Sequence, residues 1–131
     1  MSFLFQNLRV YQYAVELAER ASSLTAAFPR ANWYLADQMN RASLSVALNI
    51  AESTGRYTAA DRRRFLIMAR GSVHECVALL DICGRKKLIS GETSVELSKE
   101  LLTIARMLAG MISRLSNDDS VREEAELYDV Q

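Results

Sequence analysis

The stretch WYLADQMNRASLSVALNIAEST, from Trp33 to Thr54, decides how this chain folds. It holds only three charged residues, and its apolar residues recur at the spacing of an α-helix. At about 100° per residue, they divide between two opposite faces, Leu35, Met39, Ala42, Val46 and Ile50 on one and Trp33, Leu44, Ala47, Leu48 and Ala51 on the other. A helix that is apolar on two sides is expected to be buried on two sides. The core of so small a chain covers one face, so the other is a candidate subunit interface.

The composition favours one domain and gives no sign of a charged partner. With 131 residues, the chain is long enough for a single hydrophobic core. Its 16 Lys and Arg balance its 16 Asp and Glu, so no net charge points to nucleic acid or to a membrane. The start, MSFLFQNLRVYQ, lacks the pattern of a signal peptide, and no stretch is apolar for long enough to span a membrane. We therefore expect a cytoplasmic protein without a membrane partner.

Four segments are predicted to be helical, and no segment alternates apolar and polar residues as a strand does. Asn7 is predicted to cap the first helix, and Pro29 follows its end. Gly55 suits the left-handed position after the second helix. Thr58 is predicted to cap the third helix, with Asp61 as the negative charge of its first turn. The predicted helices span residues 8–28, 33–54, 58–87 and about 90–116.

These helices and their short connections predict an all-α fold, an antiparallel up-down-up-down four-helix bundle. Residues 1–116 form the bundle domain in this prediction. Residues 117–131 contain six acidic residues and one Arg, so we expect a solvated, partly disordered acidic tail.

The first predicted helix, like the helix at 33–54, carries apolar residues beyond its core stripe. These residues exceed what one core stripe needs, and we therefore expect a stable homo-oligomer. The oligomer interface candidates are Tyr11, Val15, Ala18, Trp33, Leu44, Leu48 and Ala51.

Positive charge is concentrated in the third predicted helix, where residues 54–87 contain eight basic and three acidic residues. One interpretation is a phosphate-binding strip, and the alternative is ordinary solvated charge at helix ends. Only Tyr57 and Phe65 supply aromatic rings there, so contacts with phosphates are expected rather than contacts with bases. A ring of subunits would repeat each small patch several times. The nucleic-acid candidates are Arg56, Arg62, Arg63, Arg64, Arg85, Lys86 and Lys87.

Polar residues on the second and third helices form another candidate group. We predict a buried network of hydrogen bonds and ion pairs that fixes the register of the helices, and the alternative is a ligand site. The members of this structural polar network are Arg41, Asn49, Glu52, Arg70 and Glu75.

No pattern of catalytic or metal-binding residues is present. His74 lies about 160° around its helix from Cys76, so the two cannot bind one ion. Cys76 and Cys83 are too far apart along a helix for a disulfide, and we expect both to be reduced residues of the core. The sequence has no Glu-x-x-His pair, phosphate loop, G-x-G-x-x-G or G-x-S-x-G motif. We predict no catalytic residue, no metal and no cofactor, and hence no enzyme.

Four runs carry a resemblance to a known family: FQNLRVYQYAVELA (5–18), LTAAFPR (24–30), QMNRASLSVALNIAESTGRYT (38–58) and RRFLIMARGSVHEC (63–76). NIAESTGR (49–56) and ARGSVHE (69–75) are the most characteristic pieces. Together the runs resemble the four helix bundle protein family, also called 23S rRNA intervening sequence proteins. The resemblance covers about the first 85 residues.

This resemblance implies a left-handed antiparallel bundle that associates into a barrel-like homopentamer. Similar proteins are accessory variability determinants of diversity-generating retroelements, where a strongly basic pentamer binds RNA and a reverse transcriptase. The present chain has no net charge. We therefore expect a non-enzymatic, homopentameric assembly protein. The alternative is a nucleic-acid-binding accessory protein that acts through the basic residues of the third helix, with RNA or a reverse transcriptase as its partner.

Overall fold

The computed structural model describes residues 2–130, with the side chains of residues 2–116. Two short 3-10 helices, η1 (Leu4–Asn7) and η2 (Arg30–Asn32), precede the first two α-helices. No strand occurs in the described residues. The predicted all-α fold with four helices is confirmed. The α-helices are α1 (Arg9–Thr25), α2 (Trp33–Thr54), α3 (Ala59–Arg85) and α4 (Gly91–Val130).

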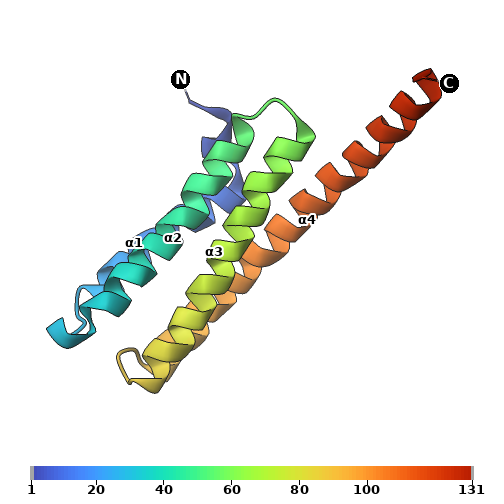
Figure 1. The fold of residues 1–131 in the computed structure, drawn as a ribbon. Helices are drawn as coiled ribbons and strands as arrows, with labels where there is room; N and C mark the ends of the chain where they lie inside the picture. The colour runs from blue at the N-terminus through green and yellow to red at the C-terminus, as the bar shows by residue number, and fades with distance from the viewer. Residues whose placement is uncertain (1, 131) are drawn as a thin grey trace.

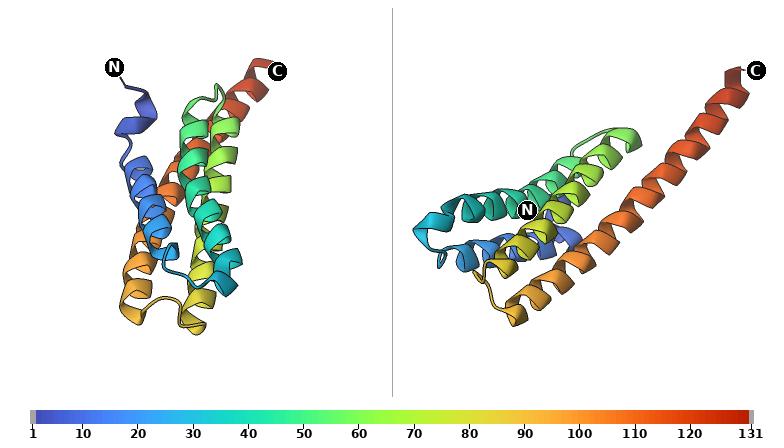
Figure 2. Two further views of the ribbon diagram at one scale, coloured as in Figure 1. Left: turned by 90° about the vertical axis from the view of Figure 1, so that its left-hand side faces the viewer. Right: turned by 60° about the horizontal axis from the view of Figure 1, so that its bottom comes forward.

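Consecutive helices run in opposite directions, and α4 extends past the ends of the other three (Figures 1 and 2). Each helix packs against two neighbours, because α1 and α3 both contact α2 and α4. The side of the bundle formed by α1 and α2 therefore lies opposite the side formed by α3 and α4. The turn from α2 to α3 is at the same end of the bundle as the N-terminus (Figure 1). No helix in the part of the chain that the structure describes combines the length and apolarity needed to cross a membrane.

The core is built from one apolar stripe of each helix. On α2 this stripe is the first face predicted from the sequence, and all five of its residues are buried. Ala14, Ala42 and Ala69 are almost completely buried, and their small side chains allow the helices to approach closely. The largest fully buried side chains of the four helices include Val10, Ile50, Leu66, Leu80, Leu101, Ile104 and Leu108.

The start of α3 agrees with its sequence, and the start of α1 does not. Thr58 caps α3, because its Oγ1 accepts a hydrogen bond from the backbone N–H of Asp61 at 3.1 Å. The prediction that Asn7 caps α1 is wrong. Asn7 is the last residue of η1, and Leu8 takes the cap position without a side-chain hydrogen bond. The end of α1 at Thr25 is three residues earlier than predicted.

Among the described residues, the left-handed residue follows α3 rather than α2. Gly55 has a φ of −86°, so the prediction of a left-handed glycine there is wrong. Lys87 has a φ of 59° instead. The N–H of Leu88 donates to the carbonyl of Cys83 at 2.9 Å, and the N–H of Lys87 donates to the carbonyl of Gly84 at 3.0 Å. These bonds form a Schellman motif, which ends α3 and turns the chain toward α4.

The C-terminal helix is longer than the sequence pattern predicted. α4 continues to Val130, past the predicted end near residue 116. The side chains of residues 117–131 lie outside the described part of the structure. The solvated acidic tail therefore stays a prediction.

Candidate functional site

The second apolar face of α2 lies on the outside of the bundle, beside α1. Leu44 and Leu48 are 51% and 56% exposed. With Tyr11, Val15 and Ala18 of α1, they line a shallow groove of about 600 Å³. We call these five residues the α1–α2 surface. The structure thus brings five of the seven predicted interface residues together on one side of the protein.

The other two interface candidates lie on the same side of α2 but outside the groove. Trp33 and Ala51 fall within about 20° of Leu44 around the helix. Trp33 is exposed and lies at the first residue of α2, about 16 Å along the axis from Leu44. Ala51 is half-buried. Both residues therefore extend the α1–α2 surface along the helix.

The five predicted polar-network residues do not form one buried network in the single chain. Arg41 is 74% exposed and pairs with Asp37 at 3.0 Å, one turn away on α2. Glu52 pairs with Arg56 at 3.1 Å, also one turn away. Exposed pairs of this kind contribute little to stability. These two members of the predicted network therefore do not fix the register between helices.

Asn49 is the member of the group that takes part in a link between helices. Its Nδ2 donates to the carbonyl of Ser45 at 2.9 Å and to the Oγ of Ser45 at 3.0 Å. The Oγ of Ser45 lies 2.8 Å from the Oγ of Ser72 on α3, so one hydroxyl donates to the other. Arg70 and Glu75 lie about 140° apart around α3 and belong to different surfaces. The sequence places Ser45 one turn before Asn49 on the same polar side of α2, but it gives no signal for Ser72.

The predicted basic strip divides into two clusters at opposite ends of α3. At 1.5 Å per residue, Arg64 and Arg85 of this helix lie about 32 Å apart along its axis. These seven residues therefore form two clusters in the single chain rather than one continuous strip. The α2–α3 turn cluster contains Arg56, Arg62, Arg63 and Arg64, and the α3–α4 turn cluster contains Arg85, Lys86 and Lys87.

Intramolecular contacts hold several residues of the α2–α3 turn cluster. The guanidinium of Arg56 lies 4.4 Å from the ring centroid of Phe65, and that of Arg64 lies 5.0 Å from it. Arg64 also pairs with Asp61 at 3.6 Å. Arg62 donates from Nε to the backbone carbonyl of Arg56 at 2.7 Å. Part of the positive charge of the cluster is therefore offset within the chain.

An exposed aromatic ring accompanies this cluster. Tyr57 is 99% exposed in the turn between Arg56 and the start of α3. An exposed ring beside guanidinium groups can stack on a base while the cations contact phosphates. The sequence showed that Tyr57 was near the basic residues, but only the structure shows that its ring is uncovered.

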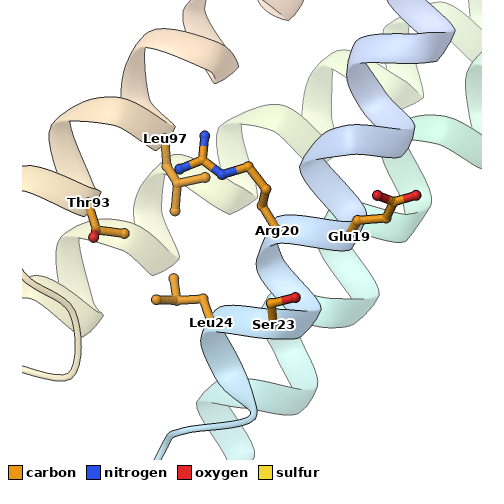
Figure 3. A pocket seen from close by; sticks show the side chains of 6 residues that line it. All are labelled: Glu19, Arg20, Ser23, Leu24, Thr93 and Leu97. Atoms are coloured by element: carbon orange, nitrogen blue, oxygen red, sulfur yellow. The ribbon is translucent and has the colours of Figure 1, made fainter.

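A hollow of about 430 Å³ lies between α1 and α4 (Figure 3). Arg20 points across it toward α4, where its guanidinium pairs with Glu96 at 3.1 Å and with Glu100. Glu19 points away from α4 (Figure 3). The two carboxylates of α4 neutralise the guanidinium of Arg20, and the described residues that line the hollow with Ser23 and Thr93 include no histidine. This arrangement provides no activated nucleophile.

The two thiols are chemically protected. Burial, together with the nearby negative charge of Glu75, raises the pKa of the Cys76 thiol to about 12. Burial also raises the pKa of Cys83. Both thiols are therefore protonated at neutral pH, which makes them poor nucleophiles and poor metal ligands. Among the described residues, no three His, Cys, Asp or Glu side chains form a group that could hold a metal ion.

The family model of the 23S rRNA-intervening sequence protein matches residues 6–110 of the chain. The chain belongs to this family. The matched residues include the α1–α2 surface and both basic clusters. Family membership thus confirms the resemblance carried by the four sequence runs.

A solved structure from Bacteroides thetaiotaomicron shares the fold of this 23S rRNA-intervening sequence family member. It is described as a protein with unknown function from the S23 ribosomal protein family. The two structures have a TM-score of 0.75 and 22% sequence identity, over 79% of this chain and 97% of the other. No curated protein matches the chain.

Proposed function

We propose that this protein is a non-enzymatic assembly protein, which associates with further copies of itself in the cytoplasm to form a closed ring. The α1–α2 surface carries this proposal. Its central residues, Leu44 and Leu48, are exposed in the middle of the outer face of α2, where a solvated helix would carry polar residues. Contiguous apolar surface of this kind marks protein-protein interfaces.

The number of copies that we propose is five. It rests on the resemblance to the 23S rRNA-intervening sequence proteins, since the family resemblance implies a homopentamer. The shape of the subunit is compatible with this number, because a long bundle can contact one neighbour on each side. Three short connections between the α-helices and a dense core also make the subunit a rigid building block.

Substitution of Leu48 by Glu tests the proposed interface. An unpaired carboxylate buried between copies is strongly unfavourable, so we expect Leu48→Glu to give single chains in size-exclusion chromatography with light scattering. Thr103→Glu is the matched control, because it places the same charge on an exposed part of α4, away from the α1–α2 surface. This control should keep the wild-type mass, and circular dichroism should show folded helices in both variants. An assembly that Leu48→Glu leaves intact would refute this interface.

A second candidate function is binding of single-stranded nucleic acid at the α2–α3 turn cluster. The exposure of Tyr57 favours it, because Tyr57 follows Arg56, whose backbone carbonyl accepts the hydrogen bond from Arg62. Stacking and phosphate contacts are then available together. A ring of five copies would bring five such turns to one end of the assembly, because each turn lies at one end of its bundle (Figure 1). RNA, or a reverse transcriptase bound to RNA, would be the partner in this case.

Binding of a fluorescent single-stranded RNA at several salt concentrations tests this second function. Affinity should fall steeply with salt, and a triple change of Arg62, Arg63 and Arg64 to Glu should abolish binding while the assembly keeps its mass. Deletion of residues 117–131 should strengthen binding, because it removes a net charge of minus five. If the shortened chain shows no binding even in low salt, the nucleic-acid function is excluded.

A further inference from the structure

The end of the bundle where α1 joins α2 and α3 joins α4 combines exposed apolar groups with positive charge. Both connections lie at this end, opposite the N-terminus (Figures 1 and 2). We call residues 26–34 and 85–90 the Trp33 end. These two segments contain no acidic residue. Their four basic residues are Arg30 and the three residues of the α3–α4 turn cluster.

The apolar groups of the Trp33 end belong to the connection between α1 and α2. Trp33 and Tyr34 are the first two residues of α2, and their exposed fractions are 66% and 53%. Ala26, Ala27 and Ala31, which precede them in the connection, are also exposed. Tryptophan and tyrosine combine an apolar ring with one polar group, and both are enriched where water meets the hydrocarbon of a membrane. The connection therefore has the side chains that suit a membrane interface.

The cations of the Trp33 end are available to an anion from outside the chain. None of the four forms an ion pair with a described side chain. In the adjoining helical turns, the carboxylate of Asp37 is held by Arg41 at 3.0 Å. Asp81 and Glu92 offset two of the four positive charges, which leaves a local surplus of two. The charge of the whole chain is zero and hides this surplus.

The acidic part of α4 lies at the opposite end of the molecule. Residues 117–130 contain six acidic residues and one Arg, and this part of α4 extends past the end of the bundle that carries the N-terminus (Figure 1). The 27 residues of α3 span about 40 Å between the two ends. An anionic surface that approaches the Trp33 end is therefore several Debye lengths away from the acidic residues.

We propose that the Trp33 end binds the surface of a membrane that contains anionic phospholipids. Trp33 and Tyr34 enter the layer between the headgroups and the acyl chains, while the four cations contact lipid phosphates. This peripheral contact needs no helix that crosses the membrane. It goes beyond the proposed assembly function and does not depend on it. Trp33 lies about 16 Å along α2 from Leu44, so the contact leaves the α1–α2 surface free.

A single-stranded nucleic acid fits the Trp33 end less well than a membrane does. Trp33 and Tyr34 are consecutive residues of a helix, so their side chains leave α2 about 100° apart. They therefore do not form one platform on which successive bases could stack. The exposed alanine methyl groups also provide hydrocarbon, which the interior of a lipid headgroup layer can bury.

The fluorescence of the wild-type protein tests this proposal directly, because Trp33 is the one tryptophan of the chain. Vesicles of equimolar phosphatidylglycerol and phosphatidylcholine should shift its emission to shorter wavelength. Acyl chains labelled with bromine in these vesicles should quench the emission, which shows contact with the hydrocarbon. Vesicles of phosphatidylcholine alone should cause neither change, and salt should weaken the binding to the anionic vesicles.

Two pairs of charge reversals test whether the Trp33 end makes the contact. Arg30→Glu with Lys86→Glu should weaken co-sedimentation with the anionic vesicles by at least about 25-fold, because each cation near such a surface strengthens binding about fivefold. Arg106→Glu with Arg114→Glu is the matched control. These residues are exposed on α4, about 22 and 34 Å along the helix from its start, so the control should bind as the wild-type protein does. Circular dichroism should show folded helices in both variants.

Each alternative outcome overturns the proposal. An emission spectrum that anionic vesicles leave unchanged, without co-sedimentation, shows that the protein does not bind this surface. Equal binding by the two double variants shows that the contact is made elsewhere on the protein. If single-stranded RNA changes the emission of Trp33 and the vesicles do not, the Trp33 end is a nucleic-acid site. None of these results alters the mass of the protein in solution, so the assembly function is tested separately.

Discussion

Truncation of Leu48 to Ala measures how much the α1–α2 surface contributes to assembly. In the single chain a little more than half of this side chain is exposed, so the bundle itself loses little packing. We expect the free energy of unfolding of the dissociated chain to change by no more than about 0.5 kcal/mol. Complete burial of a leucine side chain contributes about 1.5–3 kcal/mol. Burial of the exposed half between copies therefore contributes roughly 1 kcal/mol per interface.

In a ring of five copies, this loss occurs at every interface and amounts to roughly 5 kcal/mol per ring. Shared over the four association steps that build a pentamer from single chains, it raises the concentration of half-dissociation about eightfold. A dilution series followed by light scattering measures this concentration. Ile50→Ala is the matched control on the same helix, because Ile50 is completely buried in the single chain. It should lower the free energy of unfolding by about 2–5 kcal/mol.

An unchanged dissociation concentration for Leu48→Ala would contradict a role of Leu48 in assembly. So would a loss of stability of the dissociated Leu48→Ala chain as large as that of Ile50→Ala. In the first case the exposed leucine faces water in the native protein. In the second case it belongs to the core of the single bundle.

Three further predictions concern stability. Lys87→Gly should raise the free energy of unfolding, measured by urea denaturation, by about 0.5–1 kcal/mol, because glycine adopts a φ of 59° without strain. The control Lys87→Ala removes the charge but keeps a Cβ, so it should give no such increase. Asn49→Ala should lower the free energy of unfolding by about 1 kcal/mol, because it removes the hydrogen bonds to Ser45. Unchanged stability together with a lost binding activity would indicate a ligand site instead. Above pH 9 the Cys76 thiol loses its proton in the unfolded chain, whereas in the folded chain it keeps the proton up to its pKa of about 12. The free energy of unfolding should therefore fall between pH 9 and pH 12, by up to about 1.4 kcal/mol per pH unit. Cys76→Ala should show a shallower fall, and identical slopes would contradict the raised pKa.

The sequence predicts the elements of this fold because burial follows helical periodicity. The residues from Leu35 to Ile50 that recur on one face are the ones that the core buries. The apolar character of the opposite face, with Leu44 and Leu48, could be predicted for the same reason. The cap at Thr58 is equally local, since it needs only a hydroxyl three residues before the N–H that it accepts from.

The remaining features depend on neighbours that a sequence does not show. Helical spacing places Arg41 and Asn49 on one side of α2. Only the position of α3 determines that Asn49 bonds to Ser45, which contacts Ser72 of α3, whereas Arg41 pairs within α2. The local preference for glycine in the left-handed region failed at Gly55, because the turn into α3 does not use that conformation. The turn into α4 does use it and carries Lys87.

The basic residues and the exposed residues Ile67 and Leu102 show the same limit on a larger scale. Arg64 and Arg85 are close in the sequence, yet a continuous helix places them at opposite ends of the bundle. Ile67 and Leu102 lie on different helices, and their common side becomes visible only when the packing of α3 against α4 is known.

Native mass spectrometry of the wild-type protein at micromolar concentration tests the proposed assembly most directly. The proposed homopentamer should give one dominant species of about 74 kDa, five times the chain mass of 14.7 kDa. A protein that has the mass of one chain throughout the micromolar range would contradict it.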